Sequence, residues 1–490
     1  MNGDKKYGSI LQRTCHFEQP FAYICLNNQL HQYCSYCLRK PDSKKLYKCS
    51  KCELSRYCNK ECQRSAWKDH KAECRRLQAV YPNLPLSEVL FLSRIIDKVL
   101  FLEENGDKFG WQKCREWKAL MGHEDDIRSD ELKYAHFEKI YGKMALYRKE
   151  EMISKEKFYQ IFCKTTINSH AIHTSIGWET GIALDLGVSK YDHSCRPNCS
   201  LVFDGFYACL RSLTPEINAS DPSKAHISYI DVGRSRYHRQ KELKEKWYFD
   251  CRCERCTDPM DDVLTSICCT NKNCDEPLLI TENSEISDIL CPKCEHITPE
   301  NHVKMCQELM LSLPVQFLTE TDPNEIQLKL NEALRYLHPK NVYVTRLRAA
   351  LLHFNGSVQD NLLFVQKSVY ENYRLCFPRS DRHVAFQLLH IVKSYIEKGE
   401  RQEASLPSFI VTQTVLYTFT LDAVSYAYDA MCIFEVCFGL NHPYYLQTLA
   451  LWTFLDQSIP KSDQELFALM NFQFSKPIDL TPFLLKKLNK

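Results

Sequence analysis

The sequence predicts an α+β protein in which small cysteine-rich zinc modules interrupt a mixed core and an all-helical region follows. Three observations indicate this fold class. Cysteines cluster within residues 34–74 and 266–296, strand-like runs occur with further cysteines over 181–260, and apolar residues recur at helical spacing over 300–490. Residues 85–180 also read as helices, with few cysteines. At 490 residues the chain is too long for one core, so we expect several domains.

Composition and charge narrow the classes of protein to consider. The 63 Lys and Arg residues nearly balance the 61 Asp and Glu residues, so no global field favours nucleic acid or membrane. The first residues lack the apolar run of a signal peptide, and runs such as "VLFLSRIIDKVLFL" are too short and too charged to span a bilayer. We therefore expect a soluble intracellular protein whose 26 cysteines stay reduced and favour metal over disulfides. The sequence has no G-x-G-x-x-G or P-loop pattern, which argues against a nucleotide-binding fold.

The first cysteine cluster has the spacing C-x2-C-x11-C-x2-C-x5-C-x3-C-x7-H-x3-C. Eight ligands suit two tetrahedral zinc ions, and so short a segment gains its folding energy from coordination. By analogy with interleaved zinc modules, we assign the ligands alternately to the two ions. The first set is Cys34, Cys37, Cys58 and Cys62, and the second is Cys49, Cys52, His70 and Cys74.

This finger, residues 34–74, resembles the MYND zinc finger, down to "YCNKECQRSAWKDHKAEC" with Tyr57 and Trp67 at the aromatic positions of that family. The resemblance implies a protein-interaction module, often for proline-rich peptides. Residues 40–76 hold twelve Lys or Arg and five acidic residues, so the finger has a basic surface. A weak nucleic-acid contact or a merely solvated face would both explain this surface.

A second cluster decides the role of Cys195 in "YDHSCRPNCS". The loop "KWYFDCRCERC" supplies Cys251, Cys253 and Cys256, which leaves a zinc site one ligand short, and Cys195 is the natural fourth ligand. The alternative is a cysteine hydrolase in which Cys195 acts with its neighbours Asp192 and His193. Catalytic partners normally come from separate segments, and adjacent side chains on an extended strand point apart, so we prefer the zinc ligand.

Several motifs together resemble the SET and MYND domain-containing (SMYD) protein-lysine methyltransferases. They are "NSHAI" at 168–172, "DHSCRPNCSLVF" at 192–203, "ISYID" at 227–231 and "YFDCRCERC" at 248–256, in the order of the family. The resemblance covers nearly the whole chain and implies a split, β-rich SET domain whose D-H-S-C strand threads a knot-like core. The implied parts are a remnant of the N-terminal SET part (1–33), the MYND finger (34–74), a helical insert (75–165), the SET core (166–245), the post-SET zinc loop (246–260), a zinc ribbon (266–296) and a helical tetratricopeptide-like region (300–490).

The resemblance implies methyl transfer from S-adenosyl-L-methionine to a neutral lysine amine of a histone or another protein, in cytoplasm and nucleus. Tyr229 matches the catalytic tyrosine and also faces the donor; Trp247 and Tyr248 would wall the lysine channel. The matching donor contacts are Asn168, Asp192, His193, Tyr229, Phe249 and His123, the last in "LMGH". As a histone methyltransferase the protein would be a chromatin regulator, and we expect a monomer.

Three departures from the family pattern leave a second reading open. The chain has no G-x-G turn, so we expect the first SET strand and one side of the donor pocket to be absent. Asp192 replaces the usual Asn, and "DPSKAH" stands where the family has "G-E-E". The alternative is therefore a catalytically impaired SET protein that works as a MYND and helical-repeat adaptor or transcriptional co-regulator.

The insert at 266–296 has the spacing of a zinc ribbon. Its predicted ligands are Cys269, Cys274, Cys291 and Cys294, although Cys268 competes with Cys269.

The C-terminal region carries apolar residues at helical spacing, for example Ile326, Leu330, Leu334 and Leu337. It also repeats itself weakly, because "YRLCFPRSD" at 373–381 resembles "FEVCFGLNH" at 434–442. Each copy reads as a helix end followed by a turn, which is typical of stacked helical hairpins. Within the two copies, Cys376 and Cys437 occupy apolar positions and are predicted to be core cysteines.

Overall fold

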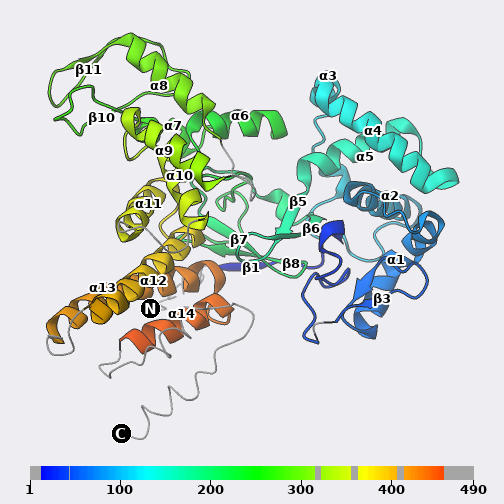
Figure 1. Cartoon of the computed structure of the whole chain (residues 1–490). Helices are drawn as coiled ribbons and strands as arrows, with labels where there is room; N and C mark the ends of the chain where they lie inside the picture. Colours follow the sequence, from blue (N-terminus) through cyan, green and yellow to red (C-terminus); the bar gives the residue numbers. More distant parts are fainter. Residues whose placement is uncertain (1–12, 44, 315–321, 355–361, 406–412, 457–490) are drawn as a thin grey trace, which may run out of the picture.

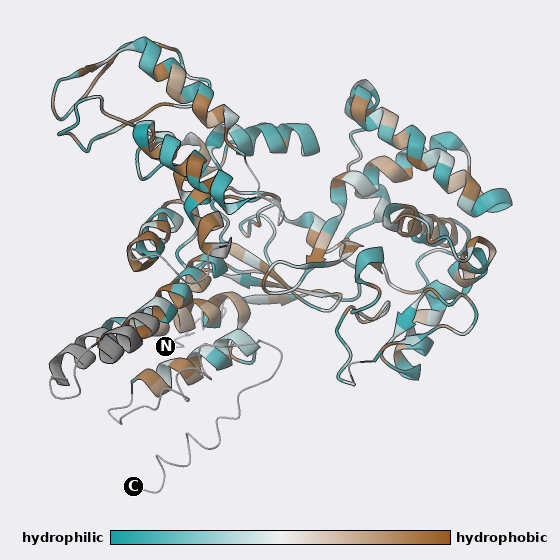
Figure 2. Ribbon diagram, in the orientation of Figure 1, coloured by the Kyte–Doolittle hydropathy of each residue, from teal (hydrophilic) through white to brown (hydrophobic). Residues whose placement is uncertain are grey.

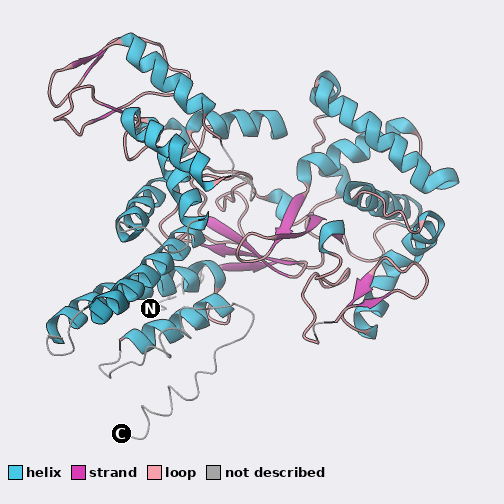
Figure 3. Cartoon of the chain, in the orientation of Figure 1, coloured by secondary structure: helices cyan, strands magenta, loops and turns pink. Residues whose placement is uncertain are grey.

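The computed structural model describes residues 13–43, 45–314, 322–354, 362–405 and 413–456. Strands gather at the centre of the molecule and helices lie on both sides of them (Figures 1 and 3). This arrangement confirms the predicted α+β class with a helical C-terminal region. Within the described ranges, no helix is both long enough and apolar enough to cross a bilayer.

The central strands form two three-stranded antiparallel sheets. In the first sheet β8 lies between β1 and β7, and in the second β6 lies between β2 and β5. Each sheet therefore joins a strand that precedes the finger to strands that follow the insert, so the core is split. The bounds are β1 (Thr14–His16), β2 (Ala22–Cys25), β5 (His170–His173), β6 (Glu179–Leu184), β7 (Cys199–Asp204) and β8 (Tyr207–Ser212).

The segment that carries the D-H-S-C motif runs beside these sheets without forming a full strand. After the short turn η4 (Val188–Lys190), His193 makes a single parallel bridge to Ile227. The Ser194 amide donates to the Ile227 carbonyl at 2.9 Å, and the Ile227 amide donates to the Asp192 carbonyl at 3.1 Å. This bridge brings "DHSC" next to the strand-like run that holds Tyr229.

The finger and the insert pack into one helical arm beside the sheets. Its elements are the η1 turn (Asn27–Gln29), β3 (Tyr47–Lys48), β4 (Arg56–Tyr57), α1 (Lys60–Val80), α2 (Ser87–Asn105), η2 (Trp117–Ala119), α3 (Glu124–Ser129), α4 (Glu131–Arg148), η3 (Lys149–Glu151) and α5 (Lys155–Asn168). Asn59 caps α1 by accepting from the Cys62 amide at 2.9 Å, so the first turn of α1 carries a metal-ligand position.

Ion pairs join α1 of the finger to α2 of the insert. The Arg94 guanidinium donates to both carboxylate oxygens of Glu73, at 2.6 and 2.8 Å. Lys98 lies 3.4 Å from Asp69, and Arg76 pairs with Asp97. Glu73, Lys98 and Arg76 are buried, and breaking a buried pair leaves an uncompensated charge. The second half of α1 is therefore held against the insert.

The finger also contacts the tight turn between β7 and β8. Arg39 of the finger makes two hydrogen bonds to the Asp204 carboxylate, at 2.7 and 2.6 Å. The next residue, Gly205, has φ +62°, and a Cβ added there would lie 2.0 Å from the Cys37 carbonyl oxygen. Only glycine fits this approach, so the β7–β8 turn rests directly on a zinc knuckle of the finger.

The other arm contains the ribbon and the C-terminal helices. Its short elements are α7 (Glu254–Thr257), η5 (Pro259–Thr265), β9 (Ile267–Cys268), β10 (Pro277–Leu278), β11 (Ile289–Leu290) and β12 (Ile297–Thr298). The longer helices are α6 (Arg236–Trp247), α8 (Glu300–Ser312), α9 (Pro323–Tyr336), α10 (Val342–Phe354), α11 (Leu362–Cys376), α12 (Arg382–Ser405), α13 (Gln413–Phe438) and α14 (Pro443–Leu455).

The central strands carry many hydrophobic residues, whereas α6 is mostly hydrophilic (Figure 2). In α9 the buried face is Ile326, Leu330 and Ala333, followed by Leu337 at the helix end. Leu334, which shares the helical spacing, is 37% exposed, whereas its neighbour Ala333 is buried. The helix that the spacing predicts is therefore present, and the buried stripe includes the small neighbour in place of Leu334.

The two copies of the C-terminal repeat have the same local structure. Cys376 and Cys437 are both buried, as predicted. Phe377 stacks on His383 with ring centroids 4.6 Å apart, and Phe438 stacks on His442 at 4.3 Å. Each copy thus ends a helix, turns and packs its phenylalanine on the histidine that follows.

An arginine from the core binds the C-terminal carbonyls of each repeated helix. Arg255 donates to the Cys376 carbonyl at 2.7 Å at the end of α11. Arg211 of β8 donates to the Val436 carbonyl at 3.0 Å near the end of α13. A guanidinium satisfies helix-terminal carbonyls and interacts favourably with the helix dipole. These two contacts fix the repeat against the core.

Replacing Gly205 by alanine should loosen the finger. Gly177→Ala is the matched control, because Gly177 also has a positive φ (+87°) but open space around the added Cβ. Both variants incur backbone strain, and only Gly205→Ala meets the Cys37 carbonyl. We expect the unfolding free energy of Gly205→Ala to fall roughly 1 to 3 kcal/mol further than that of Gly177→Ala in urea titrations. Equal losses would contradict the docking of the turn on the finger.

Acid should destabilise the folded protein through three buried histidines. Burial lowers the pKa of His170, His173 and His442 to about 4, from 6.5 in an unfolded chain. Above pH 6.5 all three are neutral in both states, and below it the unfolded chain binds protons first. The unfolding free energy therefore falls between pH 6.5 and pH 4, by about 1 kcal/mol per pH unit for each histidine.

Urea unfolding across this pH range, in zinc-saturated buffer, tests the expectation. Zinc must be in excess because acid also protonates metal ligands. His442→Asn keeps an acceptor for the α14 N-cap, where the histidine ring accepts from the Tyr444 amide at 3.2 Å. The variant should lose about one histidine's share of the pH slope, and an unchanged slope would show that His442 is not involved.

Candidate metal centres and aromatic site

Four groups of metal-ligand side chains come together among the described residues. Within each group the ligand atoms lie within 4.8 Å of one another, and all 26 cysteines of the chain are free. Thiolate and imidazole sets of this size suit tetrahedral zinc. The groups are Cys34, Cys37, Cys58 and Cys62; Cys49, Cys52, His70 and Cys74; Cys195, Cys251, Cys253 and Cys256; and Cys269, Cys274, Cys291 and Cys294.

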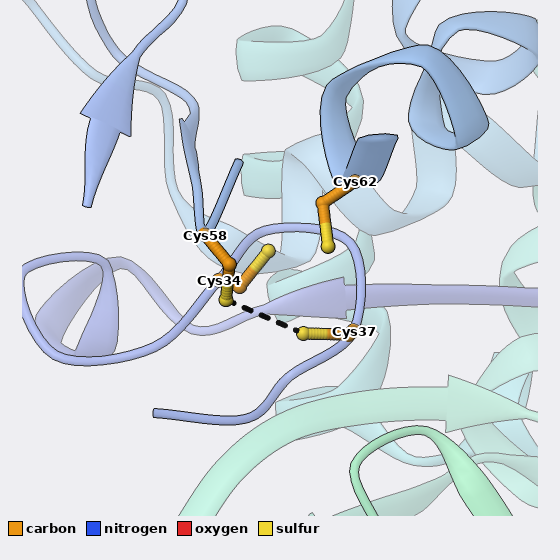
Figure 4. A group of neighbouring side chains, drawn as sticks. All are labelled: Cys34, Cys37, Cys58 and Cys62. Carbon is orange, nitrogen blue, oxygen red and sulfur yellow. Dashed lines mark hydrogen bonds between the residues drawn. The ribbon is translucent and has the colours of Figure 1, made fainter. Parts of the chain in front are cut away.

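The first group joins a loop knuckle to the start of α1 (Figure 4). The Sγ atoms of Cys37 and Cys58 lie 3.7 Å apart, and Cys62 enters from the first turn of α1. Four sulfur atoms from three segments converge on one point. The structure therefore brings together the ligands that the interleaved spacing predicted for the first ion.

The second group carries an outer shell that orients its histidine. His70 Nε2 lies 3.6 Å from Cys52 Sγ, and His70 Nδ1 lies 3.7 Å from the Glu73 carboxylate. Burial acts to raise the pKa of Glu73, but the adjoining Arg94 guanidinium outweighs it and lowers the pKa to about 2. A carboxylate behind a ligating histidine fixes the ring and its tautomer. The ion pair that holds the finger to the insert thus also supports a metal ligand.

The third group answers the question about Cys195. Its Sγ lies 3.5 Å from Cys256 Sγ, and its amide donates to Cys253 Sγ at 3.4 Å. His193 Nε2 does approach the same sulfur, at 3.2 Å, which is the geometry of a cysteine–histidine pair. Cys195 is fully buried among three other thiols, however, and Asp192 is exposed instead of supporting the imidazole. A metal ligand fits this environment, and an accessible nucleophile does not.

A buried charge network that no sequence motif indicates surrounds this group. Arg255 is fully buried and donates to the Asp261 carboxylate at 2.7 Å and to the Val232 carbonyl at 2.7 Å. Arg239, also fully buried, donates to the other oxygen of Asp261 at 2.6 Å. Arginines inside "CRCERC" and α6 read as surface charges, and only the three-dimensional arrangement shows that they pair.

The fourth group lies in the ribbon, between the hairpins β9–β10 and β11–β12. Cys269 Sγ lies 3.6 Å from Cys294 Sγ, and Cys274 Sγ lies 3.7 Å from Cys291 Sγ. Cys268 instead belongs to β9 and pairs with Pro277 of β10. The geometry therefore brings Cys269, and not Cys268, into the group.

An aromatic cluster lies beside the third group. The Tyr229 ring is 5.2 Å from Trp247 and 5.4 Å from His193, and Phe249 is 6.3 Å from His193. The Tyr229 hydroxyl donates to the Tyr191 carbonyl at 2.7 Å, and its amide donates to His193 Nδ1 at 3.0 Å. Four of the predicted site residues thus meet in one place.

Electrostatics keep the Tyr229 hydroxyl protonated. Burial, and then the negative charge of Asp192, raise the pKa of Tyr229 to about 12, while Arg115 acts in the opposite direction. Arg115 was not predicted; it donates to the carbonyls of Ser189 and Ala119 and lies near enough to act on the tyrosine. At neutral pH the hydroxyl is therefore a neutral hydrogen-bonding group and not a base.

The remaining predicted residues lie where the insert meets this cluster. The Asn168 amide donates to the carbonyls of Met121 and Lys164, at 2.8 Å each. His123 has a left-handed backbone, φ 55° and ψ 42°, and its ring lies 5.4 Å from that of Tyr248. Tyr248 thus packs against the insert, whereas its neighbour Trp247 packs on Tyr229.

A groove of about 870 Å³ borders the same residues on the outer side of the third group. His193 and Phe249 line it together with residues from the end of β8 and the turn between α11 and α12. Arg196, Arg252 and Arg379 stand along it and are exposed.

Comparison with known proteins identifies the finger and finds relatives that cover most of the chain. Residues 34–74 match the MYND finger family, so the first two ligand groups belong to a MYND-type zinc finger. Over 400 residues the chain is 26% identical to the Homo sapiens "Histone-lysine N-methyltransferase SMYD3", covering 80% of this chain and 84% of that protein. Over 304 residues it is 31% identical to the Arabidopsis thaliana "Histone-lysine N-methyltransferase ASHR1", covering 59% of this chain and 60% of that protein.

A third relative covers the chain most fully of these. Over 430 residues the chain is 24% identical to the Danio rerio "N-lysine methyltransferase SMYD2-B", covering 86% of this chain and 88% of that protein. With its MYND finger, the chain is similar to SMYD lysine methyltransferases over most of its length.

Cys253→Ser should remove one zinc ion from the purified protein. With four ligand groups, we expect four equivalents of zinc in the wild type and three in the variant, by elemental analysis. Hydrogen exchange should rise in residues 246–260, because coordination supplies the folding energy of such loops. Cys114→Ser is the control, since Cys114 is exposed and outside all four groups. Undiminished zinc in Cys253→Ser would contradict the assignment of the third group.

Proposed function

We propose that this protein is an S-adenosyl-L-methionine-dependent protein-lysine N-methyltransferase that acts on lysines of histones or other proteins. The observation that carries the proposal is the cluster of Tyr229, Trp247, Phe249 and His193 beside the third ligand group. The names of the relatives support the reaction class. The chemistry of the side chains, described next, supports a cationic donor and a cationic substrate.

The side chains around Tyr229 are of chemical types that attract a positively charged sulfonium donor. Aromatic ring faces attract cations, and the exposed carboxylate of Asp192 adds a negative charge near them. When bound, S-adenosyl-L-methionine supplies a methyl group on a positively charged sulfur. Asn168, His193, Phe249 and His123 are proposed to hold it.

Tyr229 is proposed to orient the lysine amine. Its proton is engaged with the Tyr191 carbonyl, so the oxygen lone pairs remain to accept an N–H bond from the amine. A pKa of about 12 keeps the hydroxyl from acting as a base at neutral pH. Trp247 beside Tyr229 is proposed to exclude water from the amine, and desolvation lowers the pKa of a lysine so that it presents a lone pair. Positioning, and not acid–base chemistry, is thus the proposed contribution of this residue.

Zinc at the third group is proposed to act mechanically. Cys195 follows His193 by two residues, and Cys251 follows Phe249 by two residues. Coordination of both cysteines would fix the two aromatic residues relative to each other. The other three groups are proposed to hold structural zinc in the finger and the ribbon.

The finger is proposed to bind peptide partners, including proline-rich ones, with a weak contact to nucleic acid through its basic face. Lys40, Lys45, Lys48 and Lys51 are among its exposed cations. We further propose that the protein works as a monomer in cytoplasm and nucleus and regulates chromatin.

An adaptor without transfer activity is the second candidate function. The ribbon favours it, because Leu290 and Ile297 face each other across β11 and β12 and are 62% and 56% exposed. Exposed apolar pairs of this kind mark interaction surfaces.

Two measurements separate the candidates. Calorimetry with S-adenosyl-L-methionine on zinc-replete protein, followed by labelled-methyl transfer to histones, should show binding and transfer. Tyr229→Phe should reduce kcat about 10- to 100-fold with little effect on folding, because one orienting group is lost. Tyr428→Phe, an exposed tyrosine on α13, is the control. Absence of donor binding would overturn the enzyme proposal, and full activity of Tyr229→Phe would overturn the role of that residue.

A further inference from the structure

The insert holds the aromatic residues that link α6 to the zinc loop. Trp247 Nε1 donates to the Ile167 carbonyl at 3.1 Å, at the end of α5. Lys133 of α4 donates to the Tyr248 hydroxyl at 2.7 Å. Trp247 and Tyr248, which precede the cysteines of the zinc loop, are therefore hydrogen-bonded to two different helices of the insert, α5 and α4.

Lys133 makes three contacts on one turn of chain. Its ammonium donates to the Glu245 carbonyl, one of the last in α6, besides the Tyr248 hydroxyl. The same Nζ lies 3.9 Å from the centroid of the Tyr248 ring, within cation–π range. Its side chain is 24% exposed, and Asp130 lies 3.8 Å away. A cation at a helix C-terminus interacts favourably with the helix dipole.

The turn that Lys133 contacts has a backbone that needs such support. Tyr248 ends α6 with φ 62° and ψ 27°, in the left-handed region, although it is not glycine. This conformation costs about 1 to 2 kcal/mol for an ordinary residue and persists only where its surroundings impose it. The direction of the chain after Tyr248 decides where Phe249 and Cys251 point.

We propose that Lys133 is a positioning residue that fixes the Tyr248 turn and so aims Trp247 at Tyr229 and Phe249 at His193. The helical insert is then part of the transfer site, because it sets the geometry of the aromatic wall from the opposite arm of the molecule. The effect on turnover rests on the proposed methyltransferase function. The effect on the wall does not.

Fluorine NMR of the 5-fluorotryptophan-labelled full chain tests the wall directly. The chain has six tryptophans, and Trp247→Phe identifies the signal of Trp247. Lys133→Met removes the ammonium but keeps the apolar stem, and Lys133→Arg keeps a cation. Lys139→Met is the matched control, since Lys139 is an exposed residue of the same helix. We expect the Trp247 signal to shift or broaden in Lys133→Met, to be largely restored in Lys133→Arg and to stay unchanged in Lys139→Met.

Turnover gives the second readout. Lys133→Met should lower kcat/KM roughly 10- to 100-fold, mainly through kcat, because a misplaced wall disturbs alignment more than binding. If Lys133→Met fails to fold, Tyr248→Phe replaces it, since that variant keeps the ring and loses only the hydroxyl acceptor. An unchanged Trp247 signal in the folded variant overturns the inference. A shifted signal in a protein that transfers no methyl group supports the inference and overturns the proposed function.

Discussion

The meeting of Cys195 with Cys251, Cys253 and Cys256 is the constraint on which the core depends. Four thiols within 4.8 Å in a buried site suit a zinc ion, and coordination of that ion would tie together segments more than fifty residues apart. From the same point Arg255 reaches the carbonyls of Val232 and Cys376. One junction therefore connects the threaded segment, the zinc loop and the first helical repeat.

Buried ion pairs connect the finger to the helical insert in a comparable way. Glu73 links a histidine of the finger to Arg94 of the insert, so the finger's metal site and its docking share one carboxylate. A buried ion pair of this kind gains little over an apolar contact, but removing one partner is strongly destabilising. The finger is thus less a separate module than a part of the same folded body.

The metal-ligand groups could be predicted from the spacing of cysteines and histidines in the sequence. All sixteen predicted ligands fall into the four expected groups. Fifteen of them lie in local pairs or triplets whose neighbours are two to five positions apart, and Cys195 was assigned because the loop of Cys251, Cys253 and Cys256 lacked a fourth ligand.

The roles of Arg255, Asp261 and Lys133 were not predicted. The local sequence does not distinguish a charged residue that is exposed from one that pairs with a distant segment. Spacing also leaves open which of two neighbouring helix positions is buried, because packing decides that Ala333 is buried and Leu334 is partly exposed. Tyr248 shows the same limit, because its left-handed backbone, which no motif indicates, places its ring against His123 and Lys133 of the insert.

The contact of Gly205 with the Cys37 carbonyl has a consequence for any partner of the finger. A module on a flexible linker searches a volume, and its linker length sets the effective concentration of what it captures. This finger is anchored to a turn of the core sheet instead. A captured peptide would therefore be presented to the core at one fixed distance and angle, and only partners whose own length bridges that gap could engage both surfaces at once.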